Sequence, residues 1–509
     1  MIGSFKLREF QKIVLNGDDV EVSDAVFETV ERANEFLKNF SKDKIIYGIN
    51  TGFGPMAQYR INESDQIQLQ YNLVRSHAQG MGDYLSDHQI RAVLLSRLNT
   101  LSLGKSGVNS GVIEQIKTFL NRKIHPAIQE HGGVGASGDL VQLAQLAQGL
   151  IGEGKVIFEG AVRPAKEVLA EQNIEPLKLT LRDGLALING TSSMTGIAAL
   201  NTYYSRRLVE WTILTSSVLN ELVEAFGDAF SNELNGAKRH SGQSQVASSI
   251  QDVLSSSSRI KDRHSHPFLN SIPEEEKFNR KVQEYYSLRC IPQIVGPVLD
   301  TLIHCETIVE QEINSVNDNP IVDVEKGSVY HGGNFHGDYV SLEMDKLKIA
   351  VIRLSMLMDR QFNFLLNHRL NKTFPPFLND KILGLNFGFQ GAQYAVTSTT
   401  AENQTLGFPM YLHSIPCNND NQDIVSMGSN SALITAKVIN NTFEVLSLYI
   451  QGISHAIDLV NDEGSFSEKG RAVHNKIKDL NGGFDSDLPI NEKGAKLVEY
   501  LKNNQPLQI

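Results

Sequence analysis

Residues 340–365 read VSLEMDKLKIAVIRLSMLMDRQFNFL, and apolar side chains recur in this stretch at every third or fourth position. That spacing matches the turn of an α-helix, so it predicts one long helix with a single apolar face. The face comprises Val340, Met344, Leu347, Val351, Leu354, Met358, Phe362 and Leu365. A helix of this length buries such a face most readily against other long helices, which predicts a bundle. We interpret the methionines and phenylalanines as core rather than as cofactor contacts.

Three other segments share this period: one from about Met194 to Phe230, one from Ile291 to Ile313, and one from Ala432 to Val460. The N-terminal third has shorter segments and more glycine, and a strand pair is expected at Lys155–Phe158 and Gly160–Pro164. We therefore predict a mainly all-α fold. Its expected domains are a smaller mixed region at 1–195 and a long-helix bundle with a helical tail at 196–509.

The Ser-rich and charged stretch 255–281 contains Pro267, Pro273 and three consecutive glutamates from Glu274, and is interpreted as a solvated excursion between bundle helices. The net charge of −11, with 41% hydrophobic and 21% charged residues, is typical of a soluble globular protein. It argues against nucleic acid or an anionic membrane surface as the main partner.

Three cysteines stand far apart without metal-ligand spacing: Cys290, Cys305 and Cys417. They predict reduced, buried thiols with neither a disulfide framework nor a zinc site. No apolar run approaches the length of a membrane span, and the N-terminal residues lack an apolar signal core. We expect a cytoplasmic protein with no membrane partner.

The loop 132–139 reads GGVGASGD, and its centre could change its own backbone. In a tight bend, the amide nitrogen of Gly138 could attack the carbonyl carbon of Ala136 and close a five-membered ring. Loss of two waters, one carrying the Ser137 hydroxyl, would leave a methylidene-imidazolone. Gly138 suits the attacking position because it has no Cβ to block the approach. Such a group accepts an amine nucleophile, which no ordinary side chain does.

Two other interpretations of this loop remain open. Gly133, Gly135 and Gly138 also match the dinucleotide-binding fingerprint, with an acid at Glu159 beyond it, which would suit a nucleotide-dependent oxidoreductase. Against that, residues 124–131 do not form an apolar strand, and Asp139 would repel a pyrophosphate. The loop could also be a Gly-rich turn of a purely structural helical protein.

Five further segments place polar and aromatic residues at glycine or proline breaks, where irregular chain exposes chemistry. Taken singly, each has an ordinary structural explanation, such as a half-buried tyrosine, an ion-paired arginine or a turn. The segments are Tyr47–Gly54 (YGINTGFG), Asn72–His77 (NLVRSH), Leu187–Thr191 (LINGT), Gln283–Arg289 (QEYYSLR), and Asn317–Pro320 (NDNP) with Gly332–His336 (GGNFH).

Together with the loop, these segments resemble the methylidene-imidazolone family of aromatic amino-acid ammonia-lyases and aminomutases, in the family's order from about Tyr47 to Met427. The pattern is most similar to that of bacterial tyrosine ammonia-lyases of the flavobacterial type. The resemblance implies an all-α fold shared with the aspartase and fumarase group. It also implies a homotetramer with active sites built from three subunits, and a prosthetic group self-generated from Ala136-Ser137-Gly138, with no metal, nucleotide or external cofactor.

The resemblance also implies catalytic roles. The substrate amine would add to the methylidene carbon and leave as ammonia while Tyr47 takes the β-proton. Asn189 and Tyr286 match residues near the prosthetic group, where hydrogen bonds stabilise its developing enolate-like oxygen. Arg289 would bind the substrate carboxylate, with Asn319 as a second anchor.

Other matched positions line the pocket, namely Gln283 and Phe335. Ser76 and His77 match a pair found in histidine ammonia-lyases but also in tyrosine enzymes. Gln422 stands where histidine ammonia-lyases carry a glutamate, and a neutral amide removes the charge pairing with an imidazole.

Tyr411 replaces a small residue and, with His77, would offer a substrate phenol two hydrogen-bonding partners. L-Tyrosine is therefore the expected substrate, and p-coumarate the expected product. Histidine ammonia-lyase and tyrosine 2,3-aminomutase stay open, because lyase and aminomutase share this catalytic set. The chain departs from its relatives at Gln145 and at Gln148-Gly149, which would weaken the helix after the loop if they point inward.

Overall fold

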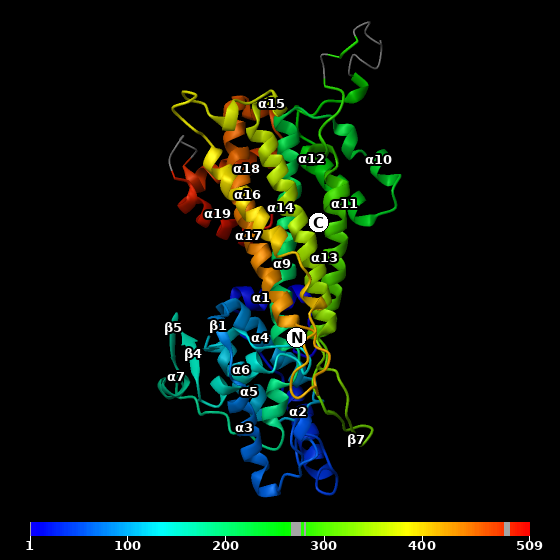
Figure 1. The fold of residues 1–509 in the computed structure, drawn as a ribbon, viewed down its shortest axis with the longest axis vertical. Helices are drawn as coiled ribbons and strands as arrows, with labels where there is room; N and C mark the ends of the chain where they lie inside the picture. Colours follow the sequence, from blue (N-terminus) through cyan, green and yellow to red (C-terminus); the bar gives the residue numbers. More distant parts are fainter. Residues whose placement is uncertain (1, 266–275, 279–280, 483–488) are drawn as a thin grey trace. The chain divides into compact units, whose positions relative to one another are not determined.

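The computed structural model describes residues 2–265, 276–278, 281–482 and 489–509, and helices make up most of it (Figure 1). In this described part the strands form three small antiparallel sheets, of order β1-β3, β2-β4-β5 and β6-β7. The predicted mainly all-α fold is confirmed.

The chain divides into two compact units. The first unit comprises Met1–Tyr203, Cys305–Asp345 and Pro409–Ala436, and the second comprises Tyr204–His304, Lys346–Phe408 and Lys437–Ile509. Because each unit draws on three stretches of chain, neither is continuous in sequence. The predicted division into a mixed region at 1–195 and a helix bundle at 196–509 stays a prediction.

Four long helices follow the predicted periodic segments: α9 (Ser192–Leu222), α13 (Ile291–Ile313), α14 (Asp338–Leu366) and α17 (Gly428–Val460). All eight apolar positions predicted for one face of α14 are fully buried. The segment predicted to run to Phe230 ends earlier, because Glu224 takes a positive φ of 49° and a 3-10 turn at Gly227–Phe230 follows.

The rest of the first unit consists of shorter elements. Its other helices are α1 (Leu7–Asn16), α2 (Asp24–Phe40), α3 (Gln66–His77), α4 (Asp87–Ser102), α5 (Ser110–Asn121), α6 (Val141–Leu150), α7 (Ala165–Glu171) and α8 (Asp183–Ile188). Its strands are β1 (Met81–Tyr84), β2 (His125–Pro126), β3 (Gln129–His131), β4 (Lys155–Phe158), β5 (Ala161–Pro164), β6 (Ile321–Asp323) and β7 (Ser328–Tyr330). The predicted strand pair is confirmed as the β4–β5 hairpin, in which Val156 faces Arg163.

The second unit adds α10 (Asn232–Gly236), α11 (Ser241–Leu254), α12 (Tyr286–Arg289), α15 (His368–Asn371), α16 (Gln390–Thr405), α18 (Glu468–Asn481) and α19 (Asn491–Asn503). The predicted excursion begins where α11 ends, and Glu276 within it is exposed. Pro267, Pro273, Glu274 and Glu275 lie outside the described residues.

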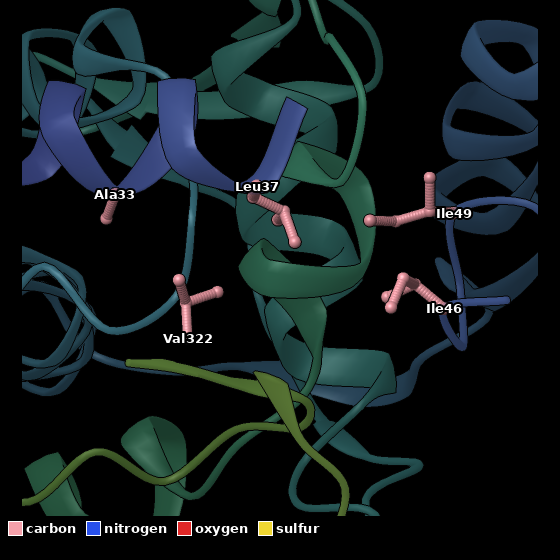
Figure 2. Packing of buried hydrophobic residues seen from close by; sticks show 5 residues of the cluster. All are labelled: Ala33, Leu37, Ile46, Ile49 and Val322. Atoms are coloured by element: carbon pink, nitrogen blue, oxygen red, sulfur yellow. The ribbon is translucent and has the colours of Figure 1, made fainter. Parts of the chain in front are cut away.

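An apolar cluster fixes the segment that carries Tyr47. Ile46 and Ile49, on either side of Tyr47, join Ala33 and Leu37 of α2 and Val322 of β6 (Figure 2). All five side chains are at most 3% exposed. Burying a large aliphatic side chain contributes about 1.5–3 kcal/mol, so this cluster ties the Tyr47 segment to two separate elements.

The cysteines were expected to be buried, and this is wrong for two of them. Cys305 is buried, whereas Cys290, at the C-terminal end of α12, and Cys417 are both half-buried. Among the described residues, none of the three cysteines forms a disulfide. Of the helices in the described ranges, none is both long and apolar enough to span a bilayer.

Candidate active site

The loop 132–139 connects β3 to α6 and packs its backbone against residue 190. Gly138 has φ of 74°, and a Cβ there would lie 2.0 Å from the carbonyl oxygen of Gly190. The next amide, that of Asp139, donates to this same oxygen over 2.8 Å. Only glycine fits this contact at position 138, because a side chain would collide with backbone.

Two amide side chains reach the two oxygens of Ser137. Asn189 donates from Nδ2 to the Ser137 carbonyl oxygen at 2.9 Å, and Gln422 donates from Nε2 to Ser137 Oγ at 3.0 Å. Asn189 Oδ1 accepts the backbone N–H of Asn319 at 2.9 Å, and Asn319 Oδ1 accepts that of Gly332 at 2.7 Å. The structure thus brings together four predicted site residues from distant parts of the sequence.

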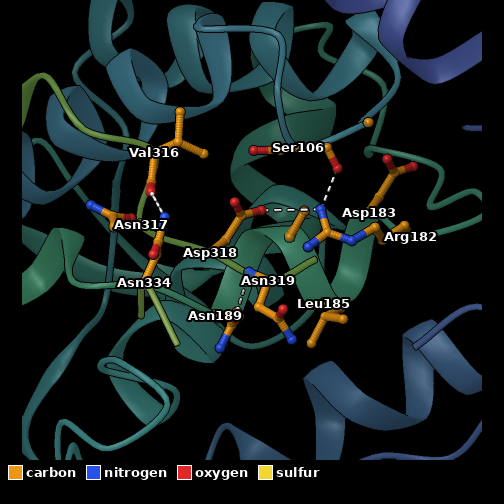
Figure 3. A network of polar contacts seen from close by, with 12 residues as sticks. Ser106, Arg182, Asp183, Leu185, Asn189, Val316, Asn317, Asp318, Asn319 and Asn334 are labelled. Atoms are coloured by element: carbon orange, nitrogen blue, oxygen red, sulfur yellow. Dashed lines mark hydrogen bonds and ion pairs between the residues drawn. The ribbon is translucent and has the colours of Figure 1, made fainter. Parts of the chain in front are cut away.

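Buried charged residues lie near Asn189 and Asn319, and Figure 3 shows two of them, Arg182 and Asp318. Arg97 of α4 is fully buried and donates to the carbonyl oxygen of Asn189 at 2.9 Å and to Asn317 Oδ1 at 3.2 Å. Burial lowers the pKa of Arg97 to about 10, so it stays charged at neutral pH. Arg182 and Asp318, also fully buried, form an ion pair of 3.0 Å.

Sequence reasoning missed Arg97. The available signal was that α4 carries two arginines, Arg91 and Arg97, within a mostly apolar stretch, since an unpaired buried charge is very costly. Its contacts fix the backbone that presents Asn189.

The Asp139 carboxylate caps the N-terminus of α9. It accepts the backbone N–H groups of Ser193 at 2.7 Å and Met194 at 3.1 Å, in the first turn of α9. Ser429, in the first turn of α17, donates its hydroxyl at 2.6 Å. Burial raises the pKa of Asp139 to about 6. This side chain locks the end of the loop onto two long helices.

Tyr47 lies on a segment that adjoins the Gln422 loop. The backbone N–H of Gly54 donates to the phenolic oxygen of Tyr47 at 2.9 Å. Gly54 is so close to Asn418 that a Cβ on it would lie 2.8 Å from Asn418 Nδ2. Beside Asn418, Cys417 exchanges two backbone hydrogen bonds with Gln422, of 3.1 and 3.3 Å. The segments that carry Tyr47 and Gln422 are therefore neighbours.

Ser76 and His77 end α3 and bond to their own helix. Ser76 Oγ donates to the carbonyl oxygen of Leu73 at 3.1 Å, and His77 Nδ1 lies 2.9 Å from that oxygen. Tyr411 is half-buried, and its backbone N–H donates to Asp345 at 2.7 Å. Phe335 is half-buried. The joint role of His77 and Tyr411 toward a substrate phenol stays a prediction.

Three predicted site residues, Gln283, Tyr286 and Arg289, belong to the second unit. The guanidinium of Arg289 lies 4.9 Å from the centre of the Tyr286 ring, and Tyr286 is 70% exposed. Arg289 Nε is buried and has no hydrogen-bond partner among the described residues. Their roles stay predictions.

Gln145 and Gly149, two positions of α6 where the chain departs from its relatives, both fit their surroundings. Gln145 is 9% exposed, accepts the backbone N–H of Gln129 at 2.8 Å and donates to its side chain at 3.0 Å. Gly149 packs against Pro126, 3.2 Å from where its Cβ would be. Gln145 therefore points inward with its polar groups satisfied, which is the condition for burying an amide at low cost.

The surroundings of the loop differ from a dinucleotide site. The strand before it, β3, is polar, partly exposed and paired antiparallel with β1. A dinucleotide fold requires a buried parallel strand at this point. Glu159 lies in the turn between β4 and β5. Within the described ranges, no group of three or more His, Cys, Asp or Glu residues could hold a metal ion.

The residues present fit a methylidene-imidazolone. Ala136 is buried, and Gly138 is held in a bend that no other residue tolerates. The Ser137 oxygen that stays in such a ring is the one bonded by Asn189, and the oxygen lost as water is the one bonded by Gln422. Asn189 is therefore placed on the oxygen where negative charge would develop, and Gln422 on the hydroxyl that would leave as water.

Comparison with known proteins identifies the chain. Residues 5–479 match the family model described as aromatic amino acid lyase. The chain is 37% identical to a tyrosine 2,3-aminomutase of Myxococcus fulvus, covering 96% of this chain and 94% of that protein. It is 40% identical to a tyrosine ammonia-lyase of Cupriavidus metallidurans, covering 84% and 81%. The crystal structure of the tyrosine aminomutase of Streptomyces globisporus superposes with a TM-score of 0.94 at 33% identity, covering 98% and 96%. The chain is a member of the aromatic amino acid lyase family.

Proposed function

We propose that this enzyme eliminates ammonia from L-tyrosine without oxidation and releases p-coumarate. The observation that carries the proposal is the pair of amides on Ser137, with Asn189 on its carbonyl oxygen and Gln422 on its hydroxyl. A loop of purely structural purpose has no need of two separate donors on one serine. Gln422 also favours tyrosine, because its neutral amide offers no charge to pair with an imidazole.

A methylidene-imidazolone formed from Ala136, Ser137 and Gly138 would supply the electrophile that makes the substrate amine a leaving group. Asn189 Nδ2 would stabilise negative charge on the Ser137 oxygen. Tyr47 would accept the β-proton at its phenolic oxygen, which the Gly54 N–H holds in place.

Two residues would orient the substrate carboxylate. Arg289 would bind it in the two-pronged geometry that a guanidinium favours, using a side chain whose Nε has no partner among the described residues. Asn319 commits its Oδ1 to Gly332, which leaves its Nδ2 for the carboxylate. Together they would hold the β-hydrogen toward Tyr47.

We also propose a cytoplasmic homotetramer with active sites shared between subunits. Large apolar side chains stand exposed in the second unit at Ile382, Leu383, Leu385 and Phe387, each at least 57% accessible. A cluster of this kind is typical of a surface that a partner covers.

The first test incubates the purified chain with tyrosine, phenylalanine and histidine in parallel. Ultraviolet absorbance follows the acrylate products, and intact mass is recorded on the same sample. We expect coumarate and a mass deficit of two waters. Ser137→Ala should restore the full mass and abolish most turnover, while the exposed Ser64→Ala should change neither. A full-mass chain without product, or urocanate as the main product, would overturn the proposal or its substrate.

A tyrosine 2,3-aminomutase is the second candidate, because the relative from Myxococcus fulvus covers almost the whole chain. The same residues would serve both outcomes, which differ in whether ammonia is added back to the product. Chromatography of the tyrosine reaction separates them, since β-tyrosine appears only with the aminomutase.

A further inference from the structure

His331, which directly follows β7, contacts the backbone of Tyr47. The N–H of Tyr47 donates to His331 Nε2 over 3.4 Å. The acceptor must be an unprotonated nitrogen, because a protonated Nε2 has no lone pair to offer. This contact therefore exists only while the imidazole is neutral.

The hairpin β6–β7 also links the Tyr47 segment to the site around Ser137. At one strand, Val322 packs in the cluster with Ile46 and Ile49 (Figure 2). At the hairpin's two ends, the N–H of Gly332 donates to Asn319, whose own N–H donates to Asn189. His331 directly precedes Gly332, whose N–H bonds Asn319. The same short segment therefore contacts both Tyr47 and Asn319.

The surroundings of His331 favour the neutral form of its imidazole. Partial burial of the ring and the positive charge of Arg182 lower the pKa of His331. Arg182 is paired with Asp318, so both buried charges behind the hairpin are fixed in place. Residue 331 as a whole is exposed, so protons from solvent reach it.

We propose that His331 is a positioning residue for Tyr47, and that its protonation releases the Tyr47 segment and lowers the rate of β-proton removal. The catalytic half of this inference rests on the proposed function. The structural part of the inference, that neutral His331 holds the Tyr47 segment by a hydrogen bond, does not depend on turnover.

The kinetic experiment compares His331→Gln and His331→Leu with the wild type across pH 5–8. Glutamine keeps a neutral acceptor at every pH, so the acid loss of kcat should move to lower pH. Leucine removes the acceptor, so kcat should fall roughly two- to tenfold at every pH, the range for one hydrogen bond. The exposed His88→Gln, on α4, is the matched control and should leave the profile unchanged.

Hydrogen–deuterium exchange of the peptide 44–56 gives a readout independent of activity. Its protection, corrected for intrinsic pH effects, should fall on acidification in the wild type and stay high in His331→Gln. It should be low at every pH in His331→Leu. Unchanged protection and unchanged acid profiles in both variants would overturn the inference. A wild type that loses protection on acidification but never releases ammonia would refute the proposed function alone.

Discussion

Asn189 connects to Ser137 through a side-chain amide whose two ends are both occupied. Its Nδ2 donates to the Ser137 carbonyl oxygen at 2.9 Å. Its Oδ1 accepts the N–H of Asn319 at 2.9 Å (Figure 3). The Asn319 N–H can only donate, so it forces Oδ1 to face it and Nδ2 to face the loop. The donor at Ser137 is thus oriented before any substrate binds, which is the condition for electrostatic catalysis.

Asn189→Asp tests that orientation with almost no change in shape. The carboxylate keeps the acceptor for Asn319 but presents an oxygen to the Ser137 carbonyl. We expect kcat to fall by roughly 10²–10³. The concentration of enzyme used to calculate kcat should include only chains whose mass shows the loss of two waters. Slow maturation of the loop is then not mistaken for slow turnover. The exposed Asn39→Asp adds the same charge elsewhere and should be neutral. A kcat within twofold of wild type would show that Asn189 has no such role.

Gln422→Glu should shift the substrate preference toward histidine. Gln422 Oε1 accepts the Cys417 thiol at 3.4 Å, and glutamate retains that acceptor while replacing the amide donor by a negative charge. A carboxylate pairs with an imidazolium and repels the π-face of a phenol, so the histidine-to-tyrosine ratio of kcat/KM should rise about tenfold or more. Parallel assays of urocanate and coumarate measure it. An unchanged ratio would place Gln422 outside the side-chain pocket.

Gly190→Ala should block maturation of the loop. Gly190 has φ of 143°, and a Cβ there would lie 2.3 Å from Arg97 Nη1 and 2.6 Å from Asn317 Oδ1. The segment would have to move away from Gly138, so the variant should keep its full mass and show no turnover.

Gly160→Ala is the matched control for this change. Gly160 has φ of 77° in the β4–β5 turn, with nothing within 4 Å of its Cβ position. The substitution should cost about 1 kcal/mol of backbone strain, and the loop 132–139 of the variant should mature normally. Equal mass deficits in both variants would contradict the close approach of the two loops.

Periodicity predicted what depends on one element at a time. The stripe on α14 is buried at every predicted position, and α13 begins and ends where its apolar pattern does. The β4–β5 hairpin was likewise expected from one short stretch of sequence. These features arise from local geometry, so a single stretch of sequence contains the information.

Contacts between polar groups that lie far apart in the sequence were not predictable in this way. Arg97 bonds residues 92 and 220 positions away in the chain, and His331 meets Tyr47 across 284 positions. No period or motif encodes such pairs, because they depend on how loops meet after folding. The resemblance to known lyases supplied Asn189 and Gln422, but not the residues that orient them.

Asp139 should make the stability of the protein depend on pH. Burial raises its pKa to about 6 from 3.8, so the folded state binds the proton more tightly than the unfolded state. The free energy of unfolding should therefore fall as pH rises from about 4 to 6, by about 3 kcal/mol from this group. Other groups titrate over this pH range too, and His331 acts in the opposite sense, because a lowered histidine pKa favours folding as pH rises.

Urea unfolding of wild type and Asp139→Asn at pH 4.5 and 7 isolates the contribution of Asp139, with the exposed Asp83→Asn as control. Wild type should lose stability relative to Asp139→Asn over this range, and parallel curves would mean that Asp139 is ionised in the folded state throughout.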